Sequence, residues 1–145
     1  MLNSIKTLAR QYAPDVVKTR RHLHAHPELS FHEYETARFV ANELKAIGLI
    51  PQEGVAGTGV VALIEGKKTN GNGADSPRTV GLRADMDALP IREANNVLYK
   101  STVAGVMHAC GHDAHTASLL GCARILTTLR DEFSGTIKLV FQPAE

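Results

Sequence analysis

The sequence predicts an α/β layer fold in a single domain. Apolar residues recur at helical spacing in several stretches, and short continuous apolar runs lie between those stretches. Strands that alternate with helices are typical of layered α/β domains. The chain has 145 residues, of which 43% are hydrophobic and 21% charged. This length suffices for a buried core, and the composition is ordinary for a soluble globular protein.

The N-terminal stretch is predicted to be helical in two segments. Apolar residues from Leu2 to Leu23 follow a broken helical period, and Pro14 is well placed in the first turn of the second segment. That segment is expected to end at His26, because Pro27 follows and a residue before proline avoids the helical conformation.

Another helix is predicted after residues 30–33, where Ser30 and Glu33 have the spacing of a capping box. We expect it to stop at Gly48, because glycine commonly terminates helices. Its expected core residues recur at helical spacing: Ala37, Val40, Leu44 and Ile47.

The middle of the chain is predicted to form strands. Residues 60–64 are a continuous apolar run bounded by glycines, which predicts a strand covered on both faces. Residues 66–78 are rich in Gly, Asn, Lys and Ser and predict an exposed loop. Residues 79–84 indicate a second strand, which we expect to pair with the first as a hairpin.

The C-terminal part predicts a helix followed by a strand. Residues 114–129 carry an apolar stripe at helical spacing, and Asp113 precedes them as an N-cap. Residues 135–142 form the last predicted strand. Pro143 ends the pairing of this strand, because proline has no backbone N–H to donate.

A cluster of metal-binding residue types lies within residues 107–115. Thiolate and neutral imidazole are the protein ligands that most readily hold Zn²⁺ or a similar ion, and only Gly111 separates Cys110 from His112. An extended backbone sends side chains at this spacing to the same side. The segment therefore indicates metal ligation, and a buried thiol followed by a histidine at a helix start fits it equally well.

Carboxylates follow two of the predicted strands. Asp85 and Asp87 come after residues 79–84, and Glu145 comes after the last strand. The carboxyl ends of strands line the ligand crevice in open α/β sheets, so these groups should approach the cysteine–histidine segment. A carboxylate at the place of Glu145, near a metal, suits a general base that activates water. The simpler interpretations are turn formers at Asp85 and Asp87 and a solvated terminus at Glu145.

The other histidines have plainer interpretations. His22, His24 and His26 are expected to form a partly exposed face of a helix and not a ligand set. His115 could share a helix face with His112, but structural packing is the simpler interpretation.

Charge and cysteine content argue against several classes of partner. A net charge of +1 with scattered lysines and arginines gives no electrostatic case for nucleic acid or an anionic membrane. No apolar run approaches the length of a bilayer span, and the N-terminus lacks the apolar segment of a secretory signal.

Of the two cysteines, Cys110 lies in the ligand-like cluster and Cys122 in a helical pattern. We therefore expect a reducing, cytoplasmic location and a core position for Cys122.

Several blocks of sequence, taken in order, closely resemble the N-terminal half of the N-acyl-amino-acid amidohydrolases. This group includes the hippurate hydrolases and the indole-acetyl-amino-acid hydrolases, within the aminoacylase and glutamate-carboxypeptidase clan of metal-dependent enzymes. The blocks are Arg-His-Leu-His at 21–24 with Pro-Glu-Leu-Ser at 27–30, Val-Ala-Gly-Thr-Gly at 55–59, Leu-Arg-Ala-Asp-Met-Asp-Ala-Leu-Pro at 82–90, Met-His-Ala-Cys-Gly-His-Asp-Ala-His at 107–115 and Phe-Gln-Pro-Ala-Glu at 141–145.

The resemblance implies roles for individual residues. Cys110 and His112 match two metal ligands of the family, the thiolate standing where related enzymes use a bridging aspartate. Glu145 matches the first glutamate of the family's Gln-Pro-Ala-Glu-Glu motif, which is the general base. Asp85 occupies the place of a histidine in relatives, and Asp87 is implied to orient the site.

The resemblance also implies an architecture and a reaction. The fold would be a three-layer αβα zinc-peptidase-like catalytic domain, of which residues 1–145 form the N-terminal part. The inserted dimerisation or lid domain, through which a homodimer would form, is absent, as are the C-terminal remainder and the later metal ligands. The reaction would be metal-dependent hydrolysis of the amide bond of N-acyl amino acids, with two divalent ions per site (zinc, manganese, cobalt or nickel). Little activity is expected from the 145 residues alone.

A function of another class stays open beside the hydrolase. In that alternative the chain is a non-catalytic metal- or thiol-binding module, and Cys110 and His112 sense or store an ion.

Overall fold

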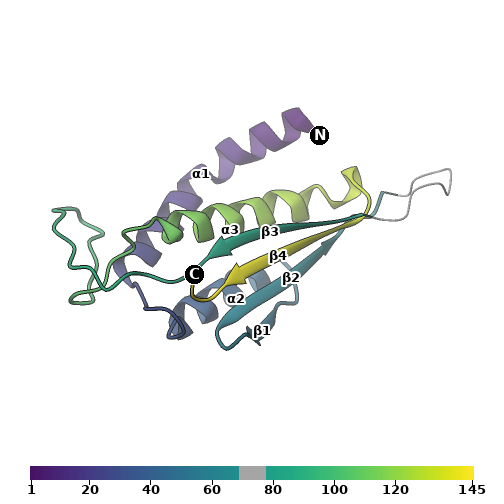
Figure 1. The fold of residues 1–145 in the computed structure, drawn as a ribbon. Coiled ribbons are helices and arrows are strands. Elements are labelled where there is room, and N and C mark those ends of the chain that lie inside the picture. The colour runs from purple at the N-terminus through teal and green to yellow at the C-terminus, as the bar shows by residue number, and fades with distance from the viewer. Residues whose placement is uncertain (69–77) are drawn as a thin grey trace.

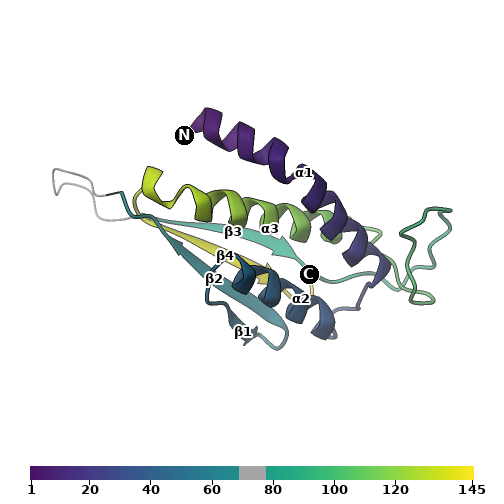
Figure 2. The same cartoon turned by 180° about the vertical axis from the view of Figure 1, so that it is seen from behind.

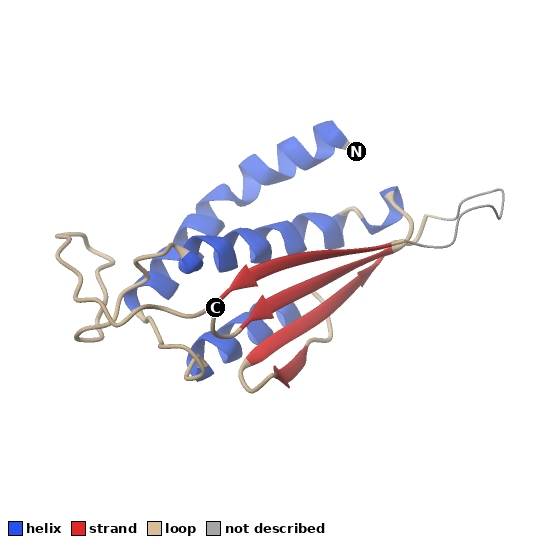
Figure 3. Ribbon diagram, viewed as in Figure 1, coloured by secondary structure: helices blue, strands red, loops and turns tan. Residues whose placement is uncertain are grey.

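In the computed structural model, which describes residues 1–68 and 78–145, helices and strands form a mixed α/β fold (Figures 1 and 3). The predicted α/β class is confirmed. The loop predicted at residues 66–78 lies mostly outside the described residues. The elements are α1 (Leu2–Ala25), α2 (Tyr34–Ala46), β1 (Gln52–Val55), β2 (Gly59–Glu65), β3 (Thr79–Asp85), α3 (His112–Thr128), a short 3₁₀ helix (Arg130–Glu132) and β4 (Thr136–Gln142).

The sheet has the strand order β1-β2-β4-β3. β4 pairs antiparallel with β2 and parallel with β3. The predicted hairpin between residues 60–64 and 79–84 is therefore wrong, because β4 lies between these two strands. The reason is the crossover through α3, which returns the chain to the sheet as a parallel neighbour of β3.

Two helices cover one face of the sheet and form the core with it. Figures 1 and 2 show α3 along β3 and α2 on the same side, beside β2. Helix α1 packs on α3. None of the described helices combines the length and apolar character needed to cross a membrane. The core cluster consists of Val40, Ala41, Leu44, Leu49, Val60, Ala62, Ile64, Ala84, Met86, Leu119, Leu120, Ala123, Leu139 and Phe141.

Strand β2 is buried on one face only. Val60, Ala62 and Ile64 point into the core, whereas Leu63 lies on the opposite face and is 48% exposed. The prediction that residues 60–64 are covered on both faces is therefore wrong for the described residues. An apolar run does not reveal how many of its faces a helix covers, because the alternation of side chains is hidden when every residue is apolar.

Helix α1 is continuous from Leu2 to Ala25, so the predicted break at Pro14 is wrong. A proline inside a helix costs about 3 kcal/mol, so other contacts must offset it. Packing on α3 is such a contact, since a Cβ atom added to Gly121 would lie 2.6 Å from Val16 Cγ2. The end of the helix immediately before His26 is as predicted.

The start of α2 uses a different cap from the one predicted. The carboxylate of Glu28 accepts hydrogen bonds from the backbone N–H groups of Glu35, at 3.1 Å, and Thr36, at 2.8 Å. Ser30 and Glu33 do not form the predicted capping box, because their side chains bond to other parts of the chain. The Glu28 carboxylate thus satisfies the free N–H groups that every helix start exposes.

Candidate metal centre

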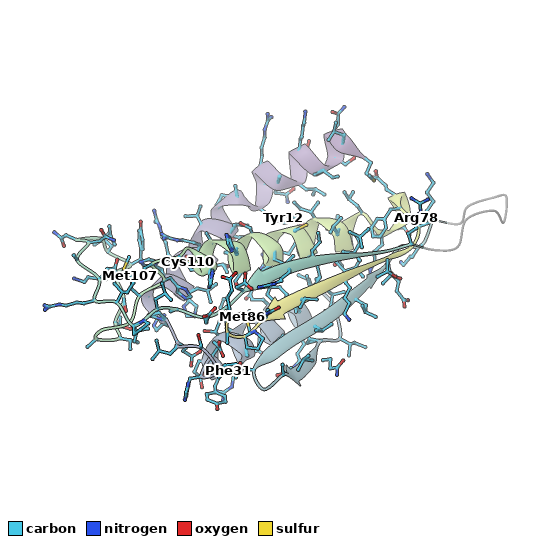
Figure 4. The ribbon with its side chains drawn as sticks, viewed as in Figure 1. Tyr12, Phe31, Arg78, Met86, Met107 and Cys110 are labelled. Atoms are coloured by element: carbon cyan, nitrogen blue, oxygen red, sulfur yellow. The ribbon has the colours of Figure 1, made fainter. Side chains whose placement is uncertain are left out.

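Three segments meet at the C-terminal ends of β3 and β4. These parallel strands end side by side, with Asp85 opposite Gln142, and the first turn of α3 lies next to them (Figure 1). Figure 4 shows Cys110 and Met86 at this end of the sheet. The predicted convergence of the strand-end carboxylates with the cysteine–histidine segment is confirmed.

Three potential ligand side chains come together there. Cys110, His112 and Glu145 each offer a ligand atom, and these atoms all lie within 4.8 Å of one another. His112 Nε2 lies 3.1 Å from Glu145 Oε2. His112 is buried, whereas Cys110 and Glu145 are exposed, so the group opens to solvent on one side. Their roles as ligands and base stay predictions.

Gly111 turns the chain between the two ligand-type residues. Its φ of +91° lies in the left-handed region, which a residue without a Cβ atom adopts without strain. Helix α3 begins at the next residue, so His112 lies in its first turn, and Cys110 remains outside the helix. The predicted helix start at residue 114 is two residues too late.

Asp87 fixes the orientation of the His112 ring. His112 Nδ1 lies 3.0 Å from Asp87 Oδ1 and 3.0 Å from the Asp87 carbonyl oxygen. With Nδ1–H donating to these oxygens, Nε2 keeps its lone pair for an ion or a proton. A carboxylate that holds the other nitrogen of a ligand histidine is a common feature of metal sites.

The Asp87 carboxylate also holds the segment that carries Glu145. Its Oδ2 accepts hydrogen bonds from Ser30 Oγ at 2.7 Å and from the Glu145 backbone N–H at 3.5 Å. Burial alone would raise the pKa of Asp87, but these bonds and the neighbouring His112 lower it below its usual value. Asp87 is thus held as a carboxylate that links three segments.

A second buried carboxylate, that of Glu33, fixes the same segment from the other side. Glu33 accepts hydrogen bonds from Thr58 Oγ1 at 2.6 Å and from the Ala144 backbone N–H at 3.0 Å. Ala144 has a φ of +46°, which is uncommon for a residue with a Cβ atom. Local spacing could not predict this role, because Glu33 and its partners are far apart along the chain.

His24 is buried in a polar network above the first turn of α3. It is 3% exposed, so the prediction of a partly exposed histidine face is wrong for this residue. Its Nδ1 lies 2.7 Å from Asp113 Oδ2, and its Nε2 lies 3.1 Å from Glu93 Oε1. Arg20 Nε approaches the same Asp113 oxygen at 2.8 Å. The helical period could not show this, because both carboxylates come from distant segments.

Asp113 is therefore not the predicted N-cap. It lies inside α3, fully buried, and the residue at the N-cap position is Gly111. The ion pairs of Asp113 tie α1 to the first turn of α3, and so to the adjacent His112. At the other end of the network, the carboxylate of Glu93 accepts a hydrogen bond from the Ser101 backbone N–H at 2.7 Å. Burial alone would raise the pKa of Glu93, but these hydrogen bonds lower it.

His108 borders this network without a partner among the described residues. It is 4% exposed, and neither ring nitrogen has a hydrogen-bond partner there. Burial lowers the pKa of His108 to about 4, against the opposing effect of the Asp113 carboxylate. Burial also raises the pKa of the half-buried Cys122 thiol. Neither Cys110 nor Cys122 forms a disulfide.

The lowered pKa of His108 predicts a loss of stability in mild acid. The unfolded state binds a proton near pH 6.5 and the folded state only near pH 4. The stabilisation that comes from keeping His108 neutral in the folded state is therefore complete above pH 6.5, and it decreases as the pH falls to about 4. We expect a loss of about 2 kcal/mol between pH 7 and pH 5, measured by urea unfolding. The variant His108→Leu should lose much less stability over this range, whereas His32→Leu, at an exposed position, should behave like the wild type. An equal loss in His108→Leu would contradict this assignment.

The α/β fold and the converging side chains can be compared with those of known proteins. Residues 81–145 match the model of peptidase family M20/M25/M40, and they include most of β3, all of α3 and β4, and the three converging segments. The chain is thus similar to the N-terminal portion of M20 amidohydrolases, which confirms the resemblance predicted from the sequence.

Individual relatives support the same family. An N-acyl-L-amino acid amidohydrolase of Geobacillus stearothermophilus is 48% identical over 141 residues, which cover 97% of this chain and 36% of the relative. An IAA-amino acid hydrolase of Arabidopsis thaliana is 48% identical over 130 residues, which cover 90% and 28%. A Bacillus subtilis structure described as a dinuclear metal binding peptidase from the M20 family matches with a TM-score of 0.84 at 42% identity, covering 94% and 36%. The chain therefore spans about a third of the length of these relatives.

Proposed function

We propose that this chain forms part of a metal-dependent amidohydrolase that cleaves the amide bond of N-acyl amino acids. The observation that carries the proposal is the group of Cys110, His112 and Glu145, whose ligand atoms lie within 4.8 Å of one another. The names of the relatives from Geobacillus and Arabidopsis support the amide bond of an acylated amino acid as the substrate class.

The donor atoms fit a divalent transition-metal ion. A thiolate, an imidazole and a carboxylate are all ligands that Zn²⁺ and its neighbours accept. His112 is suited to this role, because Asp87 holds its Nδ1 and its Nε2 faces the carboxylate of Glu145, another potential ligand. When bound, such an ion polarises the amide carbonyl and lowers the pKa of water.

Glu145 is the residue that we assign to proton transfer. Its carboxylate is exposed, so a water molecule and a substrate can reach it. Arg83 Nη2 lies 3.9 Å from its Oε1. Its backbone is held at two consecutive N–H groups, by Glu33 at Ala144 and by Asp87 at Glu145 itself. In the proposed reaction, Glu145 takes the proton of the attacking water and gives it to the leaving nitrogen.

A chimaeric enzyme tests this proposal. The N-terminal third of the Geobacillus amidohydrolase would be replaced by residues 1–145 of this chain, to which it is 48% identical. We expect the chimaera to release free amino acids from N-acyl amino acids, and a chelator to stop the reaction. The unaltered Geobacillus protein is the positive control, and Cys110→Ser in the chimaera should be inactive. A folded chimaera that binds metal but releases no amino acid would favour a non-catalytic metal-binding module instead.

A further inference from the structure

A second group of potential ligands shares His112 but uses neither Cys110 nor Glu145. Asp85, His112 and His115 each offer a ligand atom, and these atoms also lie within 4.8 Å of one another. The ring centroids of His112 and His115 are 5.7 Å apart. These two histidines are three residues apart in α3, which places them on the same side of the helix, and Asp85 is the last residue of β3.

Two members of this group, Asp85 and His112, are held in place by neighbours. Thr116 Oγ1 donates a hydrogen bond to the Asp85 carbonyl oxygen at 2.9 Å, which ties α3 to the end of β3. Arg83 donates from Nε and Nη2 to Asp85 Oδ1, at 2.8 and 2.6 Å, so that Oδ2 remains available. His112 is oriented by Asp87, as described above. Since the neighbours hold Asp85 and His112, binding an ion requires ordering only the exposed His115 side chain.

We propose that Asp85, His112 and His115 form a second position for a divalent transition-metal ion, distinct from the group that contains Cys110. Two imidazoles and a carboxylate suit Zn²⁺, Co²⁺, Ni²⁺ and Mn²⁺, whereas the thiolate of the first group favours softer ions. Because Asp87 engages His112 Nδ1, one nitrogen of this ring remains for metals. The two positions are therefore alternatives, and His112 binds one ion at a time.

The charge of Asp85 is essential to this position. The N-terminal turn of α3 carries a partial positive charge, and the Arg83 guanidinium is adjacent, so both oppose a cation. The negative charge of Asp85 offsets them. Asp85→Asn should therefore weaken binding at this position although it keeps the size and one oxygen of the side chain.

Titration of the 145-residue chain with Co²⁺, followed by absorption, tests the proposal. Bound Co²⁺ gives visible bands, and a thiolate ligand adds a charge-transfer band in the near ultraviolet. We expect Cys110→Ser to lose the thiolate band but to keep bound Co²⁺. In that background, His115→Ala or Asp85→Asn should lower the affinity by about tenfold or more, since even an outer partner of a ligand is worth about 10–100-fold. His32→Ala, at an exposed histidine outside the group, is the matched control and should change nothing.

Two results would overturn the proposal. One is the loss of all Co²⁺ binding in Cys110→Ser, and the other is unchanged affinity when His115 and Asp85 are replaced in that background. Circular dichroism would check that each variant is folded. A wild-type chain that binds Co²⁺ without a thiolate band would instead contradict the Cys110 group of the proposed function, and leave the second position standing.

Discussion

Replacing Glu145 by glutamine in the chimaeric enzyme is expected to lower kcat by about 10²–10⁴-fold and to leave the metal content nearly unchanged. Glutamine keeps the size of the side chain and one acceptor oxygen, but it cannot take a proton from water. The loss would therefore belong to proton transfer. Steady-state kinetics and metal analysis of the same preparation measure the two quantities.

The position of Glu145 allows this variant to distinguish a general base from a metal ligand. Its Oε2 lies 3.1 Å from His112 Nε2, which is also close enough for a shared ion. If Glu145→Gln empties the metal site and activity falls in proportion, then Glu145 is a ligand and not the base. Cys110→Ala is the comparison, because it removes a ligand atom and should lose metal and activity together. Glu53→Gln, at an exposed carboxylate of β1, should leave both unchanged.

Asp113→Asn is expected to destabilise the chain by about 3–5 kcal/mol, because it leaves the half-buried Arg20 guanidinium and the buried His24 ring without their anionic partner. Asp113 is fully buried and contacts His24 at 2.7 Å and Arg20 at 2.8 Å through one oxygen. Asparagine preserves the volume, so a cavity would not explain the loss. The free energy of unfolding follows from urea titration by circular dichroism.

The matched control is Asp15→Asn. Asp15 also pairs with an arginine, Arg124, but it is exposed and the distance is 3.3 Å. Exposed pairs contribute about 0–1 kcal/mol, so this variant should be nearly as stable as the wild type. Similar losses in the two variants would show that the network around His24 does not anchor the start of α3.

The sequence predicted which residues come together better than it predicted the path of the chain. Only Gly111 separates Cys110 from His112, and Asp87 and Glu145 follow the ends of strands, so their convergence was predictable. The strand order was not, because nothing in residues 60–64 or 79–84 specifies which strand lies beside each of them. The insertion of β4 between them follows from the long-range crossover through α3.

The errors at polar residues have a common cause. Ser30 and Glu33 have the spacing of a capping box, yet both form hydrogen bonds with other segments. Ser30 bonds to Asp87, and Glu33 bonds to Thr58 and Ala144. Local spacing predicts a local hydrogen bond, and it fails where a buried group elsewhere would otherwise remain unpaired. The burial of His24 was missed for the same reason. Such residues surround the candidate centre because its three segments have to be held together.

X-ray absorption spectroscopy of the zinc-loaded 145-residue chain is the most direct test of the claim that Cys110 and His112 bind a metal. We expect one sulfur neighbour at about 2.3 Å and nitrogen or oxygen neighbours at about 2.0–2.2 Å. The sulfur signal should vanish in Cys110→Ser and persist in Cys122→Ser, since Cys122 lies in α3 outside the group. A spectrum of the wild-type chain with nitrogen and oxygen neighbours alone would contradict the assignment of Cys110 as a ligand.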